Sequence, residues 1–320
     1  MMKTDSAYEI YRQKIQILNE YVWNNDKPWH VIEKWLENFT GYSFSTPECE
    51  KLMALHMLCN FNYFSQDMVR QMLKSCYEDL LIIPLKQEIR KKNNNTLDVD
   101  LINYELSKEI EVTRFLGAGN PSESGSHLLY YFRQINDLDV KYFCDYYTIF
   151  QEDQSGNIIL KDPTLKRVVF FDDLVGTGRQ LNTFIKERIK KIRASLPDLE
   201  IQFISLFATY NASKKINHAE SFNGKAKTLF ILDETYKAFG RKSRYFANRE
   251  FPSRSKIKTF SRKYSQLLGC GIRDVHGFGY SQLMLGFSYN TPDNTIPIFW
   301  KTGPHFTPIF KRYSKQGSGL

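Results

Sequence analysis

Hydrophobic residues recur at two different spacings along the chain, and the spacing changes near residue 95. Before that point they recur every three or four residues, which predicts amphipathic helices; one such series is Tyr8, Tyr11, Ile15, Leu18 and Val22. Beyond the polar, turn-prone segment 91–96, short apolar runs alternate with helical stripes, as in α/β folds. We therefore predict an all-helical region over residues 1–95 and an α/β domain over residues 96–320.

Local signals mark helix ends in the first ninety residues. Thr46-Pro47-Glu48 has the order of an N-cap, a first-turn proline and an early acid, and Ser65 precedes another helical stripe. Pro84 should kink or end that helix, because it lacks a backbone N–H. His56 lies within an apolar stripe, so we interpret it as a packed histidine and not as a ligand.

Several apolar or aromatic runs after residue 96 predict strands. They are 111–116, 142–150, 168–171, 201–209, 229–232 and 283–287, with 296–300 as an edge piece because of Pro297. The strands alternate with helical stripes, and a mostly parallel sheet is the expected arrangement.

The segment 168–180 carries the strongest chemical pattern. Val168-Val169-Phe170-Phe171 reads as a strand buried on both faces, and it is followed by Asp172 and Asp173. Gly176-Thr177-Gly178 then forms a tight loop before a helical stripe that begins near Leu181. Ligands of open α/β sheets bind at such a strand end, and a helix N-terminus suits a phosphate.

A second unit of the same kind precedes it. The predicted strand 111–116 is followed by Gly117-Ala118-Gly119 and further small polar residues, then by a helical stripe through Leu128 and Phe132. Such a loop could hold a phosphate or pyrophosphate, or it could be an ordinary connection.

Three known phosphate or acid motifs do not fit the central loop. A Walker loop needs a lysine and a hydroxyl after its last glycine, and a dinucleotide fingerprint needs a third glycine where Leu181 stands. A haloacid dehalogenase type of site would need acids at alternate positions, whereas Leu174 follows the acidic pair.

An apolar strand, two acids, three residues and Thr-Gly make a pattern that resembles the phosphoribosyltransferase signature. The resemblance implies that Asp172 and Asp173 lie near the ribose hydroxyls of phosphoribosyl pyrophosphate, with Mg²⁺ on the pyrophosphate. It also implies that the loop of Gly176, Thr177, Gly178, Arg179 and Gln180 binds the 5-phosphate, and that Gly117, Ala118 and Gly119 form the pyrophosphate loop. No residue is assigned as a direct metal ligand.

One position departs from the family pattern. The family usually has Thr or Ser where this chain has Gln180, so one hydroxyl contact to the phosphate is missing, and Arg179 could supply charge instead. An alternative interpretation of the acidic pair is helix capping without a ligand, which would leave the double-glycine turn unexplained.

The resemblance extends from about residue 100 to residue 300. With the helical front and the segment 290–300, the chain is similar to phosphoribosyltransferase-like proteins of bacterial conflict systems, including those that accompany retron reverse transcriptases. This similarity implies an antiphage effector controlled by defence partner proteins and by a complex of reverse transcriptase and nucleic acid.

Charge adds a second candidate surface. The 320 residues carry a formal net charge of +9, and basic residues are concentrated between Arg241 and Lys263, with aromatic residues interleaved. Arg254, Lys256 and Lys258 are therefore candidates for contact with nucleic acid or an acidic partner; the alternative is a solvated basic helix.

Other features limit the class of protein. The five cysteines show no CxxC pair, which favours reduced thiols and argues against a zinc site. We see no signal-like N-terminus and no apolar run near 18 residues, so we expect a cytoplasmic protein without a membrane span.

Three functions remain open from the sequence. The first is an enzyme that transfers or cleaves a ribose 5-phosphate unit, the second a non-catalytic nucleotide-sensing or assembly module of the same fold, and the third a nucleic-acid-binding scaffold. The acceptor is not predicted, since base selection in this fold belongs to variable loops.

Overall fold

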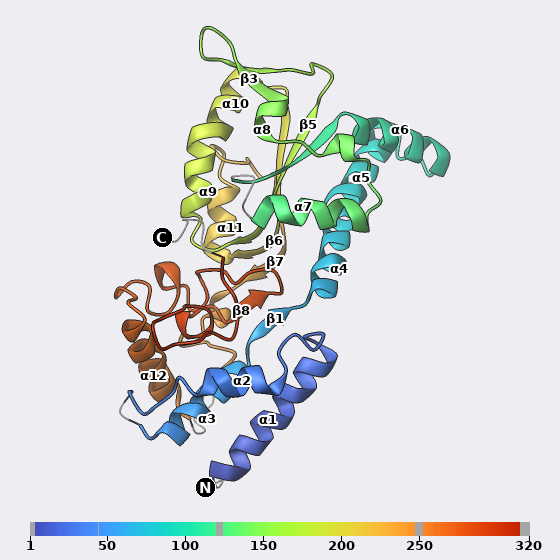
Figure 1. The fold of residues 1–320 in the computed structure, drawn as a ribbon. Helices are drawn as coiled ribbons and strands as arrows, with labels where there is room; N and C mark the ends of the chain where they lie inside the picture. Colours follow the sequence, from blue (N-terminus) through green and yellow to red (C-terminus); the bar gives the residue numbers. More distant parts are fainter. Residues whose placement is uncertain (1–3, 44, 120–123, 247–251, 314–320) are drawn as a thin grey trace. The chain divides into compact units, whose positions relative to one another are not determined.

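The chain forms two compact units in the computed structural model, which describes residues 4–43, 45–119, 124–246 and 252–313 (Figure 1). The discontinuous unit comprises Met1–Val69 and Asp233–Leu320, and the central unit comprises Arg70–Leu232. Residue 95, where the sequence predicts a boundary, lies inside the central unit, between two of its helices. Each unit groups residues that are close in space, so the discontinuous unit combines an N-terminal and a C-terminal part of the sequence.

A four-stranded parallel sheet organises the central unit. Its strands stand in the order β2 (Thr113–Gly117), β5 (Arg167–Val175), β6 (Glu200–Thr209) and β7 (Ala226–Leu232). β5 is paired on both sides, with Phe170 opposite Leu116 on β2 and Phe203 on β6. The predicted α/β class with a mostly parallel sheet is confirmed. β5 is a central strand because it pairs on both sides, and its apolar run is typical of a strand whose two faces are covered.

Helices cover the two faces of this sheet (Figure 1). On one face lies α7 (Ser124–Ile135), whose Phe132 ring is 4.5 Å from the Phe171 ring centroid. On the other lies a continuous helical stretch of α9 (Arg179–Phe184), the π-helical turn η3 (Ile185–Ile189) and α10 (Lys190–Ser195), together with α11 (Tyr210–Ile216). Phe184 packs against Phe170 at 5.2 Å, so alternate residues of β5 contact opposite layers.

Pro84 interrupts the α-helical hydrogen bonding, as the sequence predicts. α4 (Gln66–Tyr77) ends before it, a π-helical turn, η1 (Glu78–Ile82), follows, and α5 (Ile83–Lys92) begins with Pro84 in its first turn. Proline cannot donate to the carbonyl four residues earlier, which belongs to Leu80. Lys227 Nζ on β7 donates to that oxygen at 2.7 Å, so a side chain of the sheet supplies a donor that proline cannot.

The segment between α7 and β5 departs from the prediction. Residues 142–150 were expected to form a strand, but they contain the end of the short helix η2 (Val140–Tyr142) and the helix α8 (Tyr146–Ile149). Asp145 Oδ1 accepts a hydrogen bond from Thr148 N at 2.9 Å, and this cap starts the helix despite the aromatic composition. A hairpin of β3 (Phe150–Glu152) and β4 (Ile158–Leu160) follows, and α6 (Val99–Glu111) precedes β2.

The discontinuous unit contains most of the predicted N-terminal helices. Its elements are α1 (Thr4–Tyr21), α2 (Trp29–Leu36), α3 (Pro47–Leu58), β1 (Asn62–Phe64), η4 (Glu234–Tyr236), α12 (Arg254–Leu267), η5 (Phe278–Tyr280), β8 (Leu285–Phe287) and η6 (Pro297–Phe299). The core is rich in aromatic residues; Trp35, for example, stacks on Phe299 and donates its Nε1–H to Ile298 O at 3.0 Å.

The predicted helical N-terminal region is present, with one short exception. The strand β1 lies within it and pairs in parallel with β8, more than two hundred residues later, a contact that local patterns do not contain. One prediction for this unit was wrong. The segment 296–300 is not an edge strand, because Pro297 opens the 3₁₀ helix η6 instead.

Predicted helix starts and the packed histidine are confirmed. The Thr46 side chain accepts from Cys49 N at 3.3 Å, and Ser65 Oγ accepts from Met68 N at 3.5 Å. His56 Nδ1 lies 2.8 Å from the Tyr11 hydroxyl, and burial followed by the charge of Lys14 lowers its pKa to about 4. A neutral, packed imidazole fits these contacts.

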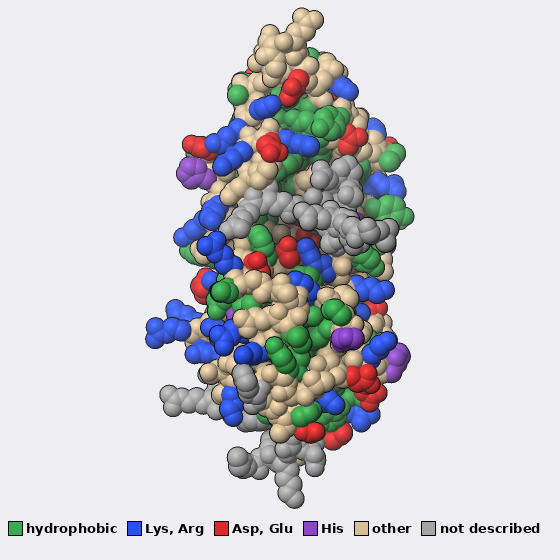
Figure 2. Space-filling model, turned by 60° about the vertical axis from the view of Figure 1, so that its left-hand side comes forward, with side chains coloured by type: hydrophobic (Ala, Val, Ile, Leu, Met, Phe, Trp, Pro, Cys, Tyr) green, Lys and Arg blue, Asp and Glu red, His purple; other side chains and the backbone are tan. Residues whose placement is uncertain are grey.

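The surface carries charges of both signs. Figure 2 shows basic and acidic side chains interspersed on one face, with the basic ones more frequent, in agreement with the net charge of +9. None of the helices in the described part of the chain is both long and apolar enough to cross a membrane.

Candidate functional site

The acidic pair, Asp172 and Asp173, lies within the last four residues of strand β5 and not after the strand. Asp172 is opposite Ser205 and Leu174 is opposite Phe207, so β6 continues to pair with β5 beyond the predicted end at residue 171. Successive strand residues face opposite sides, and Asp172 is partly buried while Asp173 is buried. Asp173 N donates to Asp172 Oδ1 at 2.9 Å, and Leu174 N donates to Asp173 Oδ1 at 2.7 Å. The two carboxylates therefore flank the end of the central strand.

The loop after β5 is held by the neighbouring strand. Thr209, the last residue of β6, donates its hydroxyl to Gly176 O at 2.7 Å. Gly178 has φ of 74° and is the N-cap of α9, and a side chain there would meet no atom within 4 Å. Glycine is needed at this position for its left-handed backbone and not for space. The loop presents the N-terminus of a helical stretch at the carboxyl end of the central strand.

The backbones of Arg179 and Gln180 form the first two residues of α9. Their side chains lie outside the described residues, so the consequence of the Gln180 substitution stays a prediction.

The glycine loop at residues 117–119 lies at the end of the adjacent strand. A Cβ on Gly117 would stand 2.6 Å from Ser126 Oγ, and one on Gly125 would stand 2.5 Å from Phe171 O. These two glycines let the first turn of α7 lie against the ends of β2 and β5. Ala118 N also donates to Phe171 O at 2.7 Å, and Gly119 has φ of 115°. Residues 120–123 lie outside the described residues.

The two predicted loops therefore meet at one edge of the sheet. β2 and β5 are parallel neighbours, so the segment 117–119 and the segment 172–178 follow the carboxyl ends of adjacent strands. A ligand with phosphates at two ends could contact both loops, and the acidic pair would lie between them.

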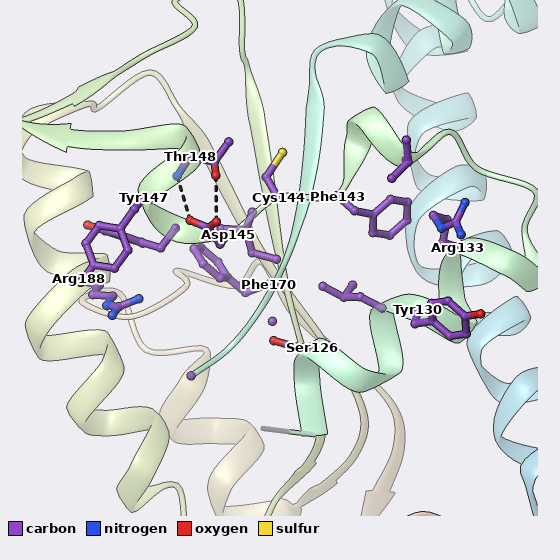
Figure 3. Close-up of a pocket in the computed structure, with 16 residues that line it drawn as sticks. Ser126, Tyr130, Arg133, Phe143, Cys144, Asp145, Tyr147, Thr148, Phe170 and Arg188 are labelled. Carbon is purple, nitrogen blue, oxygen red and sulfur yellow. Dashed lines mark hydrogen bonds between the residues drawn. The ribbon is translucent and has the colours of Figure 1, made fainter. Parts of the chain in front are cut away.

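A cavity of about 780 Å³, here called the edge pocket, opens beside the glycine loop (Figure 3). It is lined by Gly117 and Gly119, by Leu116 and Phe170 of the sheet, and by residues of α7, α8, η3 and the segment before α8. In the described part of the chain, β2 is the last strand on this side of the sheet, and Phe143 alone pairs with it there, through an isolated bridge to Phe115. The short pairing leaves room for the cavity.

The walls of the edge pocket combine aromatic and charged groups. The Arg188 guanidinium carbon lies 4.4 Å from the centroid of the Tyr146 ring. Asp145 accepts from both the N–H and the hydroxyl of Thr148 at 2.9 Å. The Thr148 hydroxyl is the main cause that lowers the pKa of Asp145, whereas burial raises the pKa of the Cys144 thiol.

A family model described as PRTase-CE matches residues 32–312. The chain belongs to the PRTase-CE family. The predicted relationship to phosphoribosyltransferase-like proteins is confirmed at this level. The match covers parts of both compact units, so the helical front and the sheet belong to one family pattern.

Comparison with solved structures gives distant likenesses for the PRTase-CE chain. The xanthine-guanine-hypoxanthine phosphoribosyltransferase of Helicobacter pylori is 13% identical, with a TM-score of 0.27, covering 54% of this chain and 85% of that one. The AQ2163 protein from Aquifex aeolicus is 14% identical, with a TM-score of 0.29, covering 63% of this chain and 84% of that one. Comparison with curated proteins gave no match.

The last part of the basic segment, from Arg254 to Lys263, lies in the amphipathic helix α12 of the discontinuous unit. α12 buries Ile257 and Phe260 in the core. Arg254 Nη1 donates to Gly240 O at 2.8 Å, so this arginine fixes a loop of its own unit. Lys256 is exposed, and Lys258 Nζ lies 5.8 Å from the Tyr280 ring centroid. Of the three predicted partner residues, Lys256 is the exposed one, and Arg254 and Lys258 are half-buried.

Apart from Gly117 and Gly119, sequence reasoning missed the residues of the edge pocket. Arg133, Tyr147 and Arg188 come from three separate elements, and no spacing connects them. The one available signal was the aromatic segment 142–150, which was taken for a strand.

Proposed function

We propose that this PRTase-CE protein binds phosphoribosyl pyrophosphate, or a nucleotide, together with Mg²⁺ and transfers or cleaves off a ribose 5-phosphate unit. The observation that carries the proposal is the meeting of two glycine loops at adjacent strand ends with an acidic pair between them, in a chain of this family. In this proposal Asp172 and Asp173 contact the ribose, the loop 176–180 binds the 5-phosphate, and the loop 117–119 binds the pyrophosphate.

The proposed roles follow from the charges of the reaction. The bond between C1 of the ribose and the pyrophosphate oxygen breaks, and pyrophosphate leaves with the electron pair. Positive charge develops on the ribose, and the carboxylates of Asp172 and Asp173 lie at the strand end where they would stabilise it. A lone pair of the acceptor, or of water in the cleavage reaction, then forms the new bond to C1, and the attacking group loses a proton.

Magnesium fits this site as an ion carried by the substrate. The described residues contain no group of three or more His, Cys, Asp or Glu that could hold a metal. Mg²⁺ commonly binds through one or two carboxylates plus substrate phosphates, and Asp172 and Asp173 are the carboxylates at this edge. When bound, the ion would neutralise the charge of the leaving pyrophosphate.

Calorimetry with phosphoribosyl pyrophosphate and MgCl₂ tests the proposal. The double variant Asp172→Ala, Asp173→Ala should bind at least about tenfold more weakly, because a hydrogen bond to a charged group contributes about 1.5–3 kcal/mol. The matched control Asp100→Ala, Glu187→Ala removes two exposed carboxylates of the central unit and should bind like the wild type. Equal binding by the acidic-pair variant would overturn the assignment.

A non-catalytic sensing or assembly module is the second candidate, and Gln180 in place of a hydroxyl favours it. Pyrophosphate release separates the two. An enzyme releases pyrophosphate with water or a suitable acceptor, whereas a sensor binds the ligand without turnover.

The biological setting is a further part of the proposal. The resemblance to effectors of retron systems supports a role in antiphage defence, in a complex with a reverse transcriptase, nucleic acid and defence partner proteins. Phage plating on bacteria that express the complete system tests it. Protection should be lost with the acidic-pair variant, and unchanged protection would contradict the role of this site in defence.

A further inference from the structure

Two tyrosine and arginine pairs lie on opposite sides of the edge pocket. Tyr130 and Arg133 project from α7 on one side, and Tyr147 and Arg188 lie on the other, on α8 and η3 (Figure 3). Tyr130 is 54% exposed and Tyr147 is 70% exposed. Each side of the cavity therefore offers aromatic surface that is open to a ligand, next to a positive charge.

The pocket has an excess of positive charge. Among the described residues, neither Arg133 nor Arg188 forms an ion pair. Asp145 is the one carboxylate among the described lining residues, and both its oxygens accept hydrogen bonds from Thr148. An anionic ligand would neutralise positive charge that no described residue pairs.

Arg188 is oriented before any ligand binds. Its guanidinium carbon lies 4.4 Å from the Tyr146 ring centroid and 5.7 Å from that of Tyr147. Stacking on rings fixes the plane of a guanidinium and leaves its N–H groups free to donate in pairs to a phosphate or carboxylate.

The volume and the lining of the cavity indicate what the anionic group of the ligand is attached to. A volume of about 780 Å³ lies within the range of small-molecule and cofactor sites and is far larger than one phosphate needs. Leu116 and Phe170 add apolar surface to the lining. Aromatic walls with arginines suit a flat base that carries a phosphate, since every base can stack on a tyrosine ring.

We propose that the edge pocket is a nucleotide site, in which the base stacks on an exposed tyrosine and the phosphate is bound by Arg188. The inference rests on the proposed function in one respect: Gly117 and Gly119, assigned above to pyrophosphate, also line this pocket. The nucleotide would lie beside the pyrophosphate loop, where a second substrate or an effector could act on the transfer reaction.

Calorimetric titration of the full chain with AMP and UMP tests the proposal. Arg188→Gln should weaken binding of the nucleotide by about tenfold or more, and Tyr147→Ala by about fivefold or more. Adenosine and inorganic phosphate, titrated separately, should each bind more weakly than AMP, because each lacks one of the two contacts. Lys186→Gln and Tyr104→Ala are matched controls, since both residues are exposed in the central unit and line no part of the pocket.

The same variants separate this proposal from the previous one. In Arg188→Gln, binding of phosphoribosyl pyrophosphate should stay within about twofold of the wild type, since this ligand is assigned to the loops. Nucleotide binding that survives both Arg188→Gln and Tyr147→Ala, or that is absent from the wild type, would overturn the edge-pocket proposal alone. Because Tyr147 is an exposed ring, its replacement decides the question even if Arg188→Gln does not fold.

Discussion

Arg167 anchors the strand that carries the acidic pair, and its replacement should weaken the central unit. It is only 4% exposed. Its Nε donates to Glu200 Oε2 at 2.8 Å, its Nη2 to Glu109 Oε2 at 3.0 Å, and its Nη1 to Thr113 Oγ1 at 3.1 Å. One guanidinium therefore joins β5 to β6, to α6 and to the start of β2.

The pKa of Glu200 gives the size of the effect. Burial raises this pKa, but Arg167, Gln202 and Lys225 together outweigh burial and lower it to about 2, from an ordinary value of 4.5. The difference corresponds to roughly 3 kcal/mol of stability, which is present above pH 4.5 and is lost as the pH falls through about 2. By pH 3 about 2 kcal/mol of it should be gone.

Arg167→Met removes the cation and leaves two carboxylates near each other. We expect the free energy of unfolding at pH 7 to fall by about 3–5 kcal/mol, the usual cost of breaking a buried ion pair. The difference from the wild type should shrink towards pH 3, because the wild type then loses its own contribution. Lys190→Met, which breaks an exposed pair with Glu220, should change stability little at either pH.

The assay must report on the central unit. All four tryptophans, Trp23, Trp29, Trp35 and Trp300, lie in the discontinuous unit, so tryptophan fluorescence follows that unit. Hydrogen exchange of peptides that cover β5, measured with increasing urea, follows the central unit instead. Equal protection of β5 in Arg167→Met and in the wild type at pH 7, or a difference that does not shrink by pH 3, would contradict the stabilisation of β5 by the pair of Arg167 and Glu200.

Three further variants test other parts of the structure. Glu50→Gln should lower the free energy of unfolding of the discontinuous unit by about 3–5 kcal/mol, since this fully buried carboxylate accepts two backbone N–H groups and a tyrosine hydroxyl; an unchanged fluorescence transition in urea would contradict this. Gly125→Ala should reduce binding of phosphoribosyl pyrophosphate severalfold in calorimetry, because the new Cβ would stand 2.5 Å from Phe171 O; wild-type affinity would show that the contact between α7 and β5 is not needed. The double variant Lys256→Gln, Lys258→Gln should lose about one to two phosphate contacts to single-stranded nucleic acid, measured in filter binding as a smaller slope of log affinity against log salt concentration; an identical slope would exclude α12 as the interface.

The sequence predicted the chemistry of the sheet better than the organisation of the chain. The run 168–171 has no polar residue, which is typical of a strand covered on both faces, so the central position of β5 followed from the local pattern. The two glycine loops were also predictable, because each follows a strand directly and parallel strands bring their ends together.

The missed features depend on distant contacts. β1 pairs with β8 across most of the chain length, and the discontinuous unit joins both ends of the chain. The edge pocket exists because strand pairing beyond β2 stops after one bridge at Phe143, and the cap by Asp145 turned an aromatic segment into a helix. The end of the strand pairing has no local sequence pattern, whereas the Asp145 cap is a local signal that the aromatic composition of 142–150 outweighed in the prediction.

The proposed ligand positions can be checked directly in a structure of crystals grown with phosphoribosyl pyrophosphate and Mg²⁺. We expect the 5-phosphate in the loop that follows Asp173, the ribose beside the acidic pair, and the pyrophosphate at Gly117–Gly119. Ligand density bound elsewhere in the central unit, or both loops empty in crystals of a protein that binds the ligand in solution, would contradict these positions.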